Sequence, residues 1–146
     1  MSNRNAMSGE DLSKRIQELR ELREVHKSAH RRPRQRSLTK VQRNRILEKT
    51  GGRCHICGGK IKGAWNADHI LAHSRGGKHS VDNYLPAHGT CNHYRWDYLP
   101  EEFELILKLG VWTRTEIQRG SGVGRQIQDK FSKREARRLA RHVARS

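Results

Sequence analysis

The chain has 146 residues, of which 31 are Lys or Arg and 15 are Asp or Glu, giving a formal net charge of +16. Only 33% of the residues are hydrophobic, which excludes a large core and predicts one small domain with polar extensions. The sequence lacks both the apolar run of roughly 18 residues that a membrane helix needs and the apolar stretch of a secretory signal. We therefore expect an intracellular protein with no membrane contact, whose charge favours nucleic acid over other polyanions as its partner.

An amphipathic helix is predicted from Ser8 to about Lys27. Its apolar residues recur at intervals of three and four: Leu12, Ile16, Leu19, Leu22 and Val25. Ser8 and Asp11 have the spacing of an N-terminal cap. Packing on the core or pairing with its copy in a homodimer is favoured over direct DNA contact for such a helix. Residues 30–36 follow it with four arginines and a proline, which is typical of an extended basic linker.

A second helix is predicted from Thr39 to about Lys49. Thr39 and Gln42 form a capping pair, and the adjacent glycines Gly51 and Gly52 end the helix. Residues 53–98 are glycine-rich, which favours short strands and turns.

Two or more helices are predicted after Pro100. The first is expected to end at Gly110 and to be followed by another short helix. Residues 120–124, GSGVG, predict a hinge, and a basic helix capped by Ser132 and Glu135 forms the tail.

The predicted organisation has three parts. Residues 1–37 comprise the N-terminal amphipathic helix and basic linker, 38–112 the central domain, and 113–146 a basic, helical C-terminal tail. The central region holds all three cysteines and six of the nine histidines.

Two short motifs in the central domain predict a zinc site. Cys54 and Cys57 form a C-x2-C turn, and His88 and Cys91 repeat its spacing thirty residues later. Two such turns facing each other supply the tetrahedral Cys3His set that zinc accepts. Because this set leaves no open position for a reactive water, the zinc is expected to be structural. An ordinary surface role for His88 is the alternative.

A second group of residues has the chemistry needed for phosphodiester hydrolysis. His69 can act as a base near neutral pH. Asp68 and Asn92 offer the oxygen ligands that Mg²⁺ or Mn²⁺ prefers. Asn83 could hold the imidazole through its side-chain carbonyl or brace the loop.

The order of these motifs resembles the HNH endonuclease family, specifically the subgroup in which two zinc knuckles bracket a ββα-metal core. The resemblance runs from about Val41 to Asp97 and includes GGRCHICGG, DHILAHSRGG, VDNYLPAH and CNHYR. It implies an α+β fold: a small ββα-metal core, stabilised by structural zinc and flanked by basic helices. Within that core we expect two short antiparallel strands, the second carrying Asp68 and His69, against a helix that begins near Asn92.

The resemblance also implies a role for each of these residues. Asp68 and Asn92 would bind the catalytic Mg²⁺ or Mn²⁺, His69 would be the general base, and Asn83 would orient the base and fix the loop. Asn92 stands where the family name has its last histidine, so His93 is a possible substitute ligand. The family setting implies the cytoplasm or nucleoid of a bacterial or phage-infected cell.

The remaining candidates are expected to contact DNA or to pack the core. The predicted nucleic-acid-binding residues are Arg31, Arg32, Arg34, Arg36, Arg134, Arg137, Arg138 and Arg141. The remaining histidines of this region, His55, His73 and His79, are interpreted as surface residues or phosphate contacts. The aromatic residues Trp65, Tyr84, Tyr94 and Trp96 are interpreted as core packing.

The sequence thus predicts a metal-dependent DNA endonuclease that nicks DNA or cuts both strands. The alternatives are a non-catalytic, zinc-stabilised nucleic-acid-binding module and a nuclease directed at RNA. A single metal and base make one cut, so cleavage of both strands requires two nicks or a homodimer, for which the N-terminal helix is the candidate.

Overall fold

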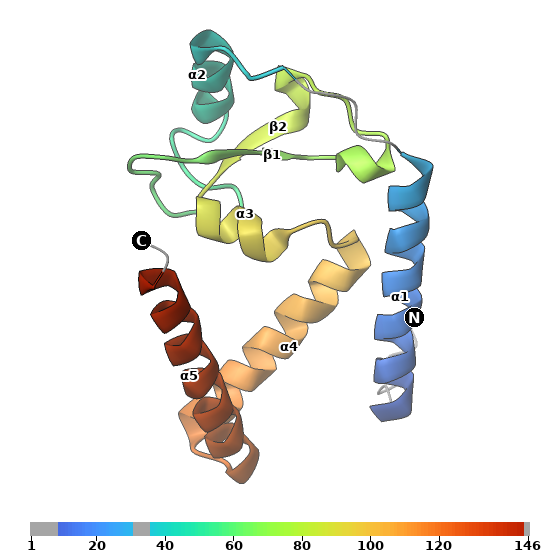
Figure 1. Ribbon diagram of the computed structural model, residues 1–146, viewed down its shortest axis with the longest axis vertical. Helices are drawn as coiled ribbons and strands as arrows, with labels where there is room; N and C mark the ends of the chain where they lie inside the picture. The colour runs from blue at the N-terminus through green and yellow to red at the C-terminus, as the bar shows by residue number, and fades with distance from the viewer. Residues whose placement is uncertain (1–8, 31–35, 145–146) are drawn as a thin grey trace, which may run out of the picture. The chain divides into compact units, whose positions relative to one another are not determined.

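The structure is a computed structural model that describes residues 9–30 and 36–144. Its contacts divide the chain into two compact units, Met1–Pro100 and Glu101–Ser146, and each is treated by itself below. Figure 1 shows the elements in chain order. No helix in the described part of the chain has the length and apolar character needed to cross a bilayer.

The core of the first unit is a two-stranded antiparallel sheet with a helix beside it (Figure 1). Strand β1, Asn66–His69, pairs with β2, Tyr84–Ala87, so that His69 lies opposite Tyr84. Helix α3, Gly89–Arg95, follows β2 and contacts β1. The predicted α+β class and its ββα-like core are therefore confirmed.

One detail of this core differs from the prediction. Asp68 and His69 lie on the first strand of the pair, whereas the sequence placed them on the second. The segment before β1 does not form a strand, because the turns of the first knuckle leave room for only one isolated bridge, between Arg53 and Lys60. Two short 3-10 helices, η1 (His73–Arg75) and η2 (Val81–Asn83), lie between the strands.

Helix α2, Lys40–Glu48, packs on β2 and η2. The predicted capping box is present, because Thr39 Oγ1 accepts from Gln42 N while Gln42 Oε1 accepts from Thr39 N. Ile46 is fully buried. Arg43 donates to the Trp65 carbonyl oxygen at 2.8 Å, and its guanidinium lies 4.1 Å from the Trp65 ring centroid.

Replacing Ile46 with Ala is expected to lower the free energy of unfolding by about 2–5 kcal/mol, because it leaves a cavity in a small core. Val41 lies on the same helix with 63% of its surface exposed, so Val41→Ala is the matched control and is expected to change stability by about 0.5 kcal/mol or less. Urea unfolding of the zinc-loaded protein measures both. Equal effects of the two substitutions would contradict the packing described for α2.

Helix α1, Gly9–Ala29, packs on its own unit. Leu19 and Arg23 are buried. Arg23 and Lys27 lie over the Trp96 ring, 4.4 and 4.3 Å from its centroid. The predicted packing of this helix on the core is therefore observed, while Ile16, Leu22 and Val25 stay exposed.

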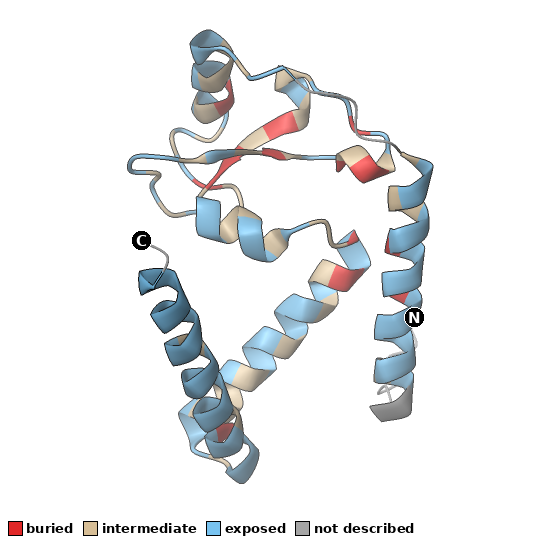
Figure 2. Ribbon diagram, in the orientation of Figure 1, coloured by how far each residue is buried: buried red, intermediate tan, exposed pale blue. Residues whose placement is uncertain are grey.

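Strand β2 is the most buried element, since Tyr84, Pro86 and Ala87 are buried, and Figure 2 shows smaller buried patches on the other elements. Tyr84 is buried, as predicted, but Tyr94 and Trp96 are 51% and 50% exposed. The interpretation of these two aromatics as core residues is wrong. The core is too small to enclose them, and Trp96 is covered instead by cations of α1.

The second unit contains α4, Pro100–Arg119, except for its first residue, together with α5, Gly122–Val143. Gly110 does not end α4, which continues to Arg119, since a glycine inside a helix costs only about 1 kcal/mol. The predicted boundary after residue 112 therefore falls inside a continuous helix.

The predicted hinge at residues 120–124 is a tight connection between the two helices. Gly120 adopts a left-handed φ of 63° after the end of α4, and the Ser121 hydroxyl caps α5 by accepting from Gly124 N at 3.0 Å. A Cβ at Gly124 would lie 2.2 Å from the Glu116 carbonyl oxygen. The glycine thus serves close packing, and α5 begins ten residues before the predicted cap at Ser132.

Candidate metal centre and active site

The first knuckle is a tight turn held by its own backbone. Gly58 N donates to the Cys54 carbonyl at 2.8 Å, and Cys54 N donates to the Gly59 carbonyl at 2.9 Å. Gly58 has a φ of 72°, which favours glycine. The turn therefore directs Cys54 and Cys57 toward the same point.

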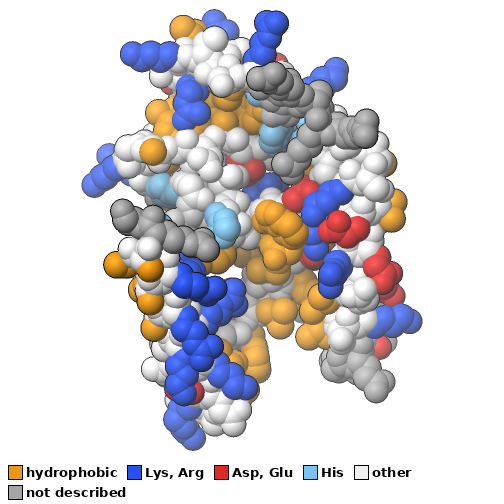
Figure 3. All heavy atoms as spheres, viewed as in Figure 1, with side chains coloured by type: hydrophobic (Ala, Val, Ile, Leu, Met, Phe, Trp, Pro, Cys, Tyr) orange, Lys and Arg blue, Asp and Glu red, His pale blue; other side chains and the backbone are white. Residues whose placement is uncertain are grey.

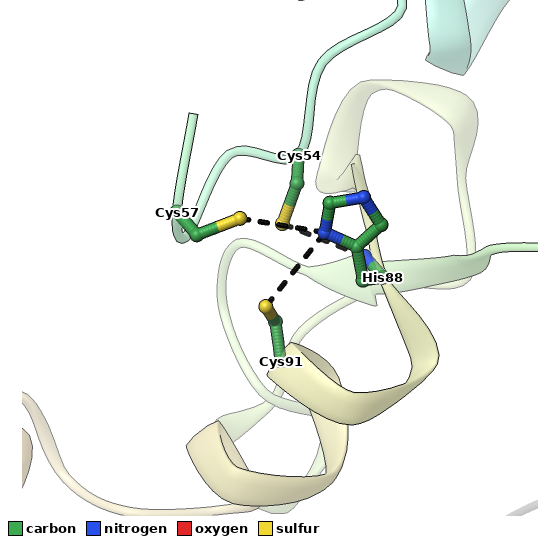
Figure 4. A group of neighbouring side chains, drawn as sticks. All are labelled: Cys54, Cys57, His88 and Cys91. Atoms are coloured by element: carbon green, nitrogen blue, oxygen red, sulfur yellow. Dashed lines mark hydrogen bonds between the residues drawn. The ribbon is translucent and has the colours of Figure 1, made fainter. Parts of the chain in front are cut away.

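The structure brings together the four predicted zinc ligands (Figure 4). One ligand atom from each of Cys54, Cys57, His88 and Cys91 lies within 4.8 Å of the others. His88 Nδ1 is 3.3 Å from Cys57 Sγ and 3.8 Å from Cys91 Sγ. A tetrahedron with Zn–S of about 2.3 Å and Zn–N of about 2.0 Å places neighbouring ligand atoms roughly 3.5–3.8 Å apart, so the cluster fits structural zinc.

A hydrogen bond selects the ligating nitrogen of His88. Its Nε2 lies 3.1 Å from the Lys60 carbonyl oxygen and must donate to it. The neutral ring then carries its lone pair on Nδ1, the atom that faces the thiols. A partner outside the metal shell that fixes the tautomer is a common feature of metal-binding histidines.

The side chains of the cluster differ in how readily they release their protons. Burial raises the pKa of the Cys54 thiol, but backbone N–H groups, chiefly those of Cys57 and His88, outweigh it and lower that pKa to about 6. Burial and the neighbouring thiols raise the pKa of Cys91 to about 12. The hydrogen bond to the Lys60 carbonyl, followed by that with Cys57, raises the pKa of the His88 imidazole.

Zinc binding is expected to release more protons as the pH falls through about 6. At pH 7 the Cys54 thiol, with its pKa of about 6, is already ionised, whereas Cys91, with a pKa of about 12, must lose its proton to bind metal. Below pH 6 Cys54 is protonated as well, and so is the His88 imidazole, whose pKa is raised, so zinc displaces more protons and its affinity falls as the pH falls. Calorimetry in two buffers of different ionisation enthalpy counts the protons. A count that stays constant from about pH 7 to about pH 5.5 would contradict these pKa values.

A cavity of about 540 Å³ lies between β1, η1, α3 and the segment after α3. Four predicted site residues line it: Asp68, His69, Asn92 and His93. Its lining also includes His73, Arg95 and Asp97. The structure therefore gathers the predicted base and the predicted oxygen ligands around one space.

Asp68 is buried, and each of its carboxylate oxygens has a donor. His55 Nε2 lies 2.7 Å from Oδ2, and Arg95 Nη1 lies 3.3 Å from Oδ1. Neither contact was predicted, since His55 was interpreted as a surface residue or phosphate contact. Arg95 could have been found from its spacing, because residues 92 and 95 lie on the same face of a helix.

The other predicted residues have distinct surroundings. The His69 ring packs on Tyr84, with 4.4 Å between the ring centroids. Asn83 braces the loop: its Oδ1 accepts from Leu71 N at 2.9 Å, and its Nδ2 donates to the carbonyls of Leu71 and Lys78. Of the two roles considered for Asn83, the loop-bracing contacts are those observed, and a role in orienting the base stays a prediction.

The histidines His55, His73 and His79, interpreted as surface residues or phosphate contacts, have different surroundings in the structure. His88 is the one histidine that the described residues place in the Cys3His cluster. His73 lines the cavity. His79 donates from Nε2 to the Arg36 carbonyl at 2.8 Å, and its Nδ1 accepts from the Tyr84 hydroxyl.

The predicted basic contacts lie in two regions. Arg134, Arg137, Arg138 and Arg141 are exposed on α5, where Figure 3 shows Lys and Arg side chains gathered along the helix. Arg36 is also exposed. Arg31, Arg32 and Arg34 lie outside the described residues.

The comparisons with known proteins agree with the site. The family model described as HNH endonuclease matches residues 54–95. No curated protein and no solved structure matches the chain. The matched span contains the Cys3His cluster together with Asp68, His69 and Asn92 of the cavity. The family consists of nucleases, so the match implies phosphodiester hydrolysis and a nucleic-acid substrate. Residues 54–95 of this chain are therefore a domain of the HNH endonuclease family.

Proposed function

We propose that the chain is a divalent-metal-dependent endonuclease that hydrolyses phosphodiester bonds in DNA. The observation that carries this proposal is the cavity in which Asp68, His69 and Asn92 meet, inside the span that matches the family. A base and two oxygen ligands around one space are what the hydrolysis needs. A binding module would need none of these three residues.

His69 is the general base of this proposal. Its ring lines the cavity and packs on Tyr84, which restricts its orientation. It takes a proton from the water that attacks the scissile phosphorus. The 3′ oxygen leaves, so the products carry 5′-phosphate and 3′-hydroxyl ends.

Asp68 and Asn92 are the proposed ligands of Mg²⁺ or Mn²⁺. A buried carboxylate and an amide oxygen are hard donors, and both line the cavity, so this pair fits such a cation. A cation bound there would stabilise negative charge on the phosphorane and on the leaving oxygen. His93 lines the same cavity and is the substitute ligand in this proposal.

The basic residues are proposed to hold the phosphate backbone. Four exposed arginines of α5 are three or four residues from one another along the helix and so share one face: Arg134, Arg137, Arg138 and Arg141. Such contacts release counterions and give affinity that falls steeply with salt. Residues 38–112 are proposed as the nuclease domain, with 1–37 and 113–146 as its basic extensions.

A homodimer is proposed only for cleavage of both strands. One base makes one cut, so a double-strand break needs a second copy or two successive nicks. The exposed Ile16, Leu22 and Val25 on α1 are the candidate contacts for a second copy.

Nicking of supercoiled plasmid by the zinc-loaded protein tests the proposal. With Mg²⁺ or Mn²⁺ we expect conversion of the plasmid to open-circular DNA. In a second assay, we expect an RNA to be cleaved more slowly than a DNA of the same length and sequence. Retardation of DNA without cleavage in any divalent cation would favour the non-catalytic binding module. Faster cleavage of RNA would favour the RNA-directed nuclease.

A further inference from the structure

His55 belongs to the zinc knuckle by sequence, but its side chain reaches the proposed active site. It follows Cys54 directly, inside the first C-x2-C turn. Its Nε2 lies 2.7 Å from Asp68 Oδ2, and the two side chains are only 18% and 7% exposed. A short hydrogen bond shielded from water holds its partner more firmly than an exposed one.

The position of His55 is set by the elements on both sides of it. Its backbone N donates to the carbonyl of Pro86 on β2 at 2.9 Å, and Pro86 is fully buried. Its neighbour Cys54 is a member of the Cys3His cluster. The ring is thus anchored to the knuckle and to the strand that pairs with β1.

Asp68 is held from two directions. His55 binds Oδ2 from the knuckle, and Arg95 binds Oδ1 from α3. Each carboxylate oxygen has a second lone pair, so these two donors leave the group able to bind a cation while restricting its orientation. The Arg95 contact, at 3.3 Å, is the longer of the two.

We propose that His55 is a positioning residue that orients Asp68 for the catalytic cation, and so connects the zinc knuckle to the cavity. The inference rests on the proposed role of Asp68 as a cation ligand. It adds a second function to the Cys3His cluster, which then fixes a ligand of the active site as well as the fold.

Binding of Mn²⁺ to the zinc-loaded full chain, followed by the electron paramagnetic resonance signal of free Mn²⁺, tests this inference without a cleavage assay. His55→Ala is expected to weaken Mn²⁺ binding by about 10–100-fold, the usual effect of losing a partner of a metal ligand. His55→Gln is expected to recover most of the affinity, because its amide N–H can donate to Asp68. Ile56→Ala, in the same turn, is the matched control and is expected to bind Mn²⁺ as the wild type does.

Several outcomes would overturn the inference. Unchanged affinity in His55→Ala, or no recovery in His55→Gln, excludes a positioning role. Loss of zinc from both variants, measured by metal analysis, shows that His55 serves only the knuckle. Asp68→Asn separates this inference from the proposed function. If Asp68→Asn binds Mn²⁺ normally, Asp68 is not a cation ligand, and the inference fails with that role. If Asp68→Asn binds Mn²⁺ weakly while His55→Ala binds it normally, only the inference is overturned.

Discussion

Substitution of His69 by Ala is expected to lower the rate of plasmid nicking by about 10²–10⁴-fold, the usual contribution of general base catalysis. His69 is the cavity residue that follows the buried Asp68 on β1, and its ring packs on Tyr84. Alanine leaves no group at this position that could take the proton from water. The measurement is the initial rate of nicking at saturating Mg²⁺ or Mn²⁺.

The loss must come from chemistry rather than from folding or DNA binding. His69→Ala is therefore expected to retain zinc and to retard DNA as the wild type does. His26→Ala is the matched control, since His26 lies on α1 and does not line the cavity. A nicking rate in His69→Ala within tenfold of the wild type would contradict the assignment and direct attention to His73 and His93, which line the same cavity.

Local patterns were enough to predict the zinc cluster and the helix caps. The ligands come in two pairs, each three residues apart, and the capping box of α2 spans only Thr39–Gln42, so nearby residues specify each pair and the cap. The ββα-like core also agrees with the prediction, and Asp68, His69 and Asn92 line one cavity, although their catalytic roles stay predictions. The family resemblance supplied this order of motifs, which periodicity alone does not provide.

Most of the missed features depend on contacts that a local pattern does not reveal. His55 and Asp68 are thirteen residues apart in sequence, and nothing in CHIC indicates which way its histidine points. Trp96 was misplaced because its partners lie on α1. Gly110 and Gly124 were interpreted as breaks, although one is tolerated inside α4 and the other allows close approach to Glu116.

Removal of zinc is expected to unfold the core around the two strands. Few hydrophobic side chains of the described first unit are buried: Leu19, Ile46, Cys54, Ala72, Tyr84, Pro86, Ala87 and Leu99. Structural zinc contributes about 10–16 kcal/mol of apparent binding energy in small domains, which matches or exceeds the roughly 5–15 kcal/mol by which domains are stable. The metal-free core is therefore not expected to persist, whether zinc is removed by chelation or Cys91→Ser removes one ligand.

The probe must report on this core, because α1, α4 and α5 contribute most of the helical signal and do not contain the cluster. We expect loss of the near-ultraviolet circular dichroism of Trp65 and Tyr84 and collapse of amide chemical-shift dispersion, both restored by stoichiometric Zn²⁺. Thr90→Ser changes the exposed neighbour of Cys91 and is expected to keep zinc and both signals. The opposite outcome is a chelated protein that keeps its cooperative thermal transition and its near-ultraviolet signal. It would show that packing alone maintains the core and that the Cys3His cluster is not what holds β1 against α3.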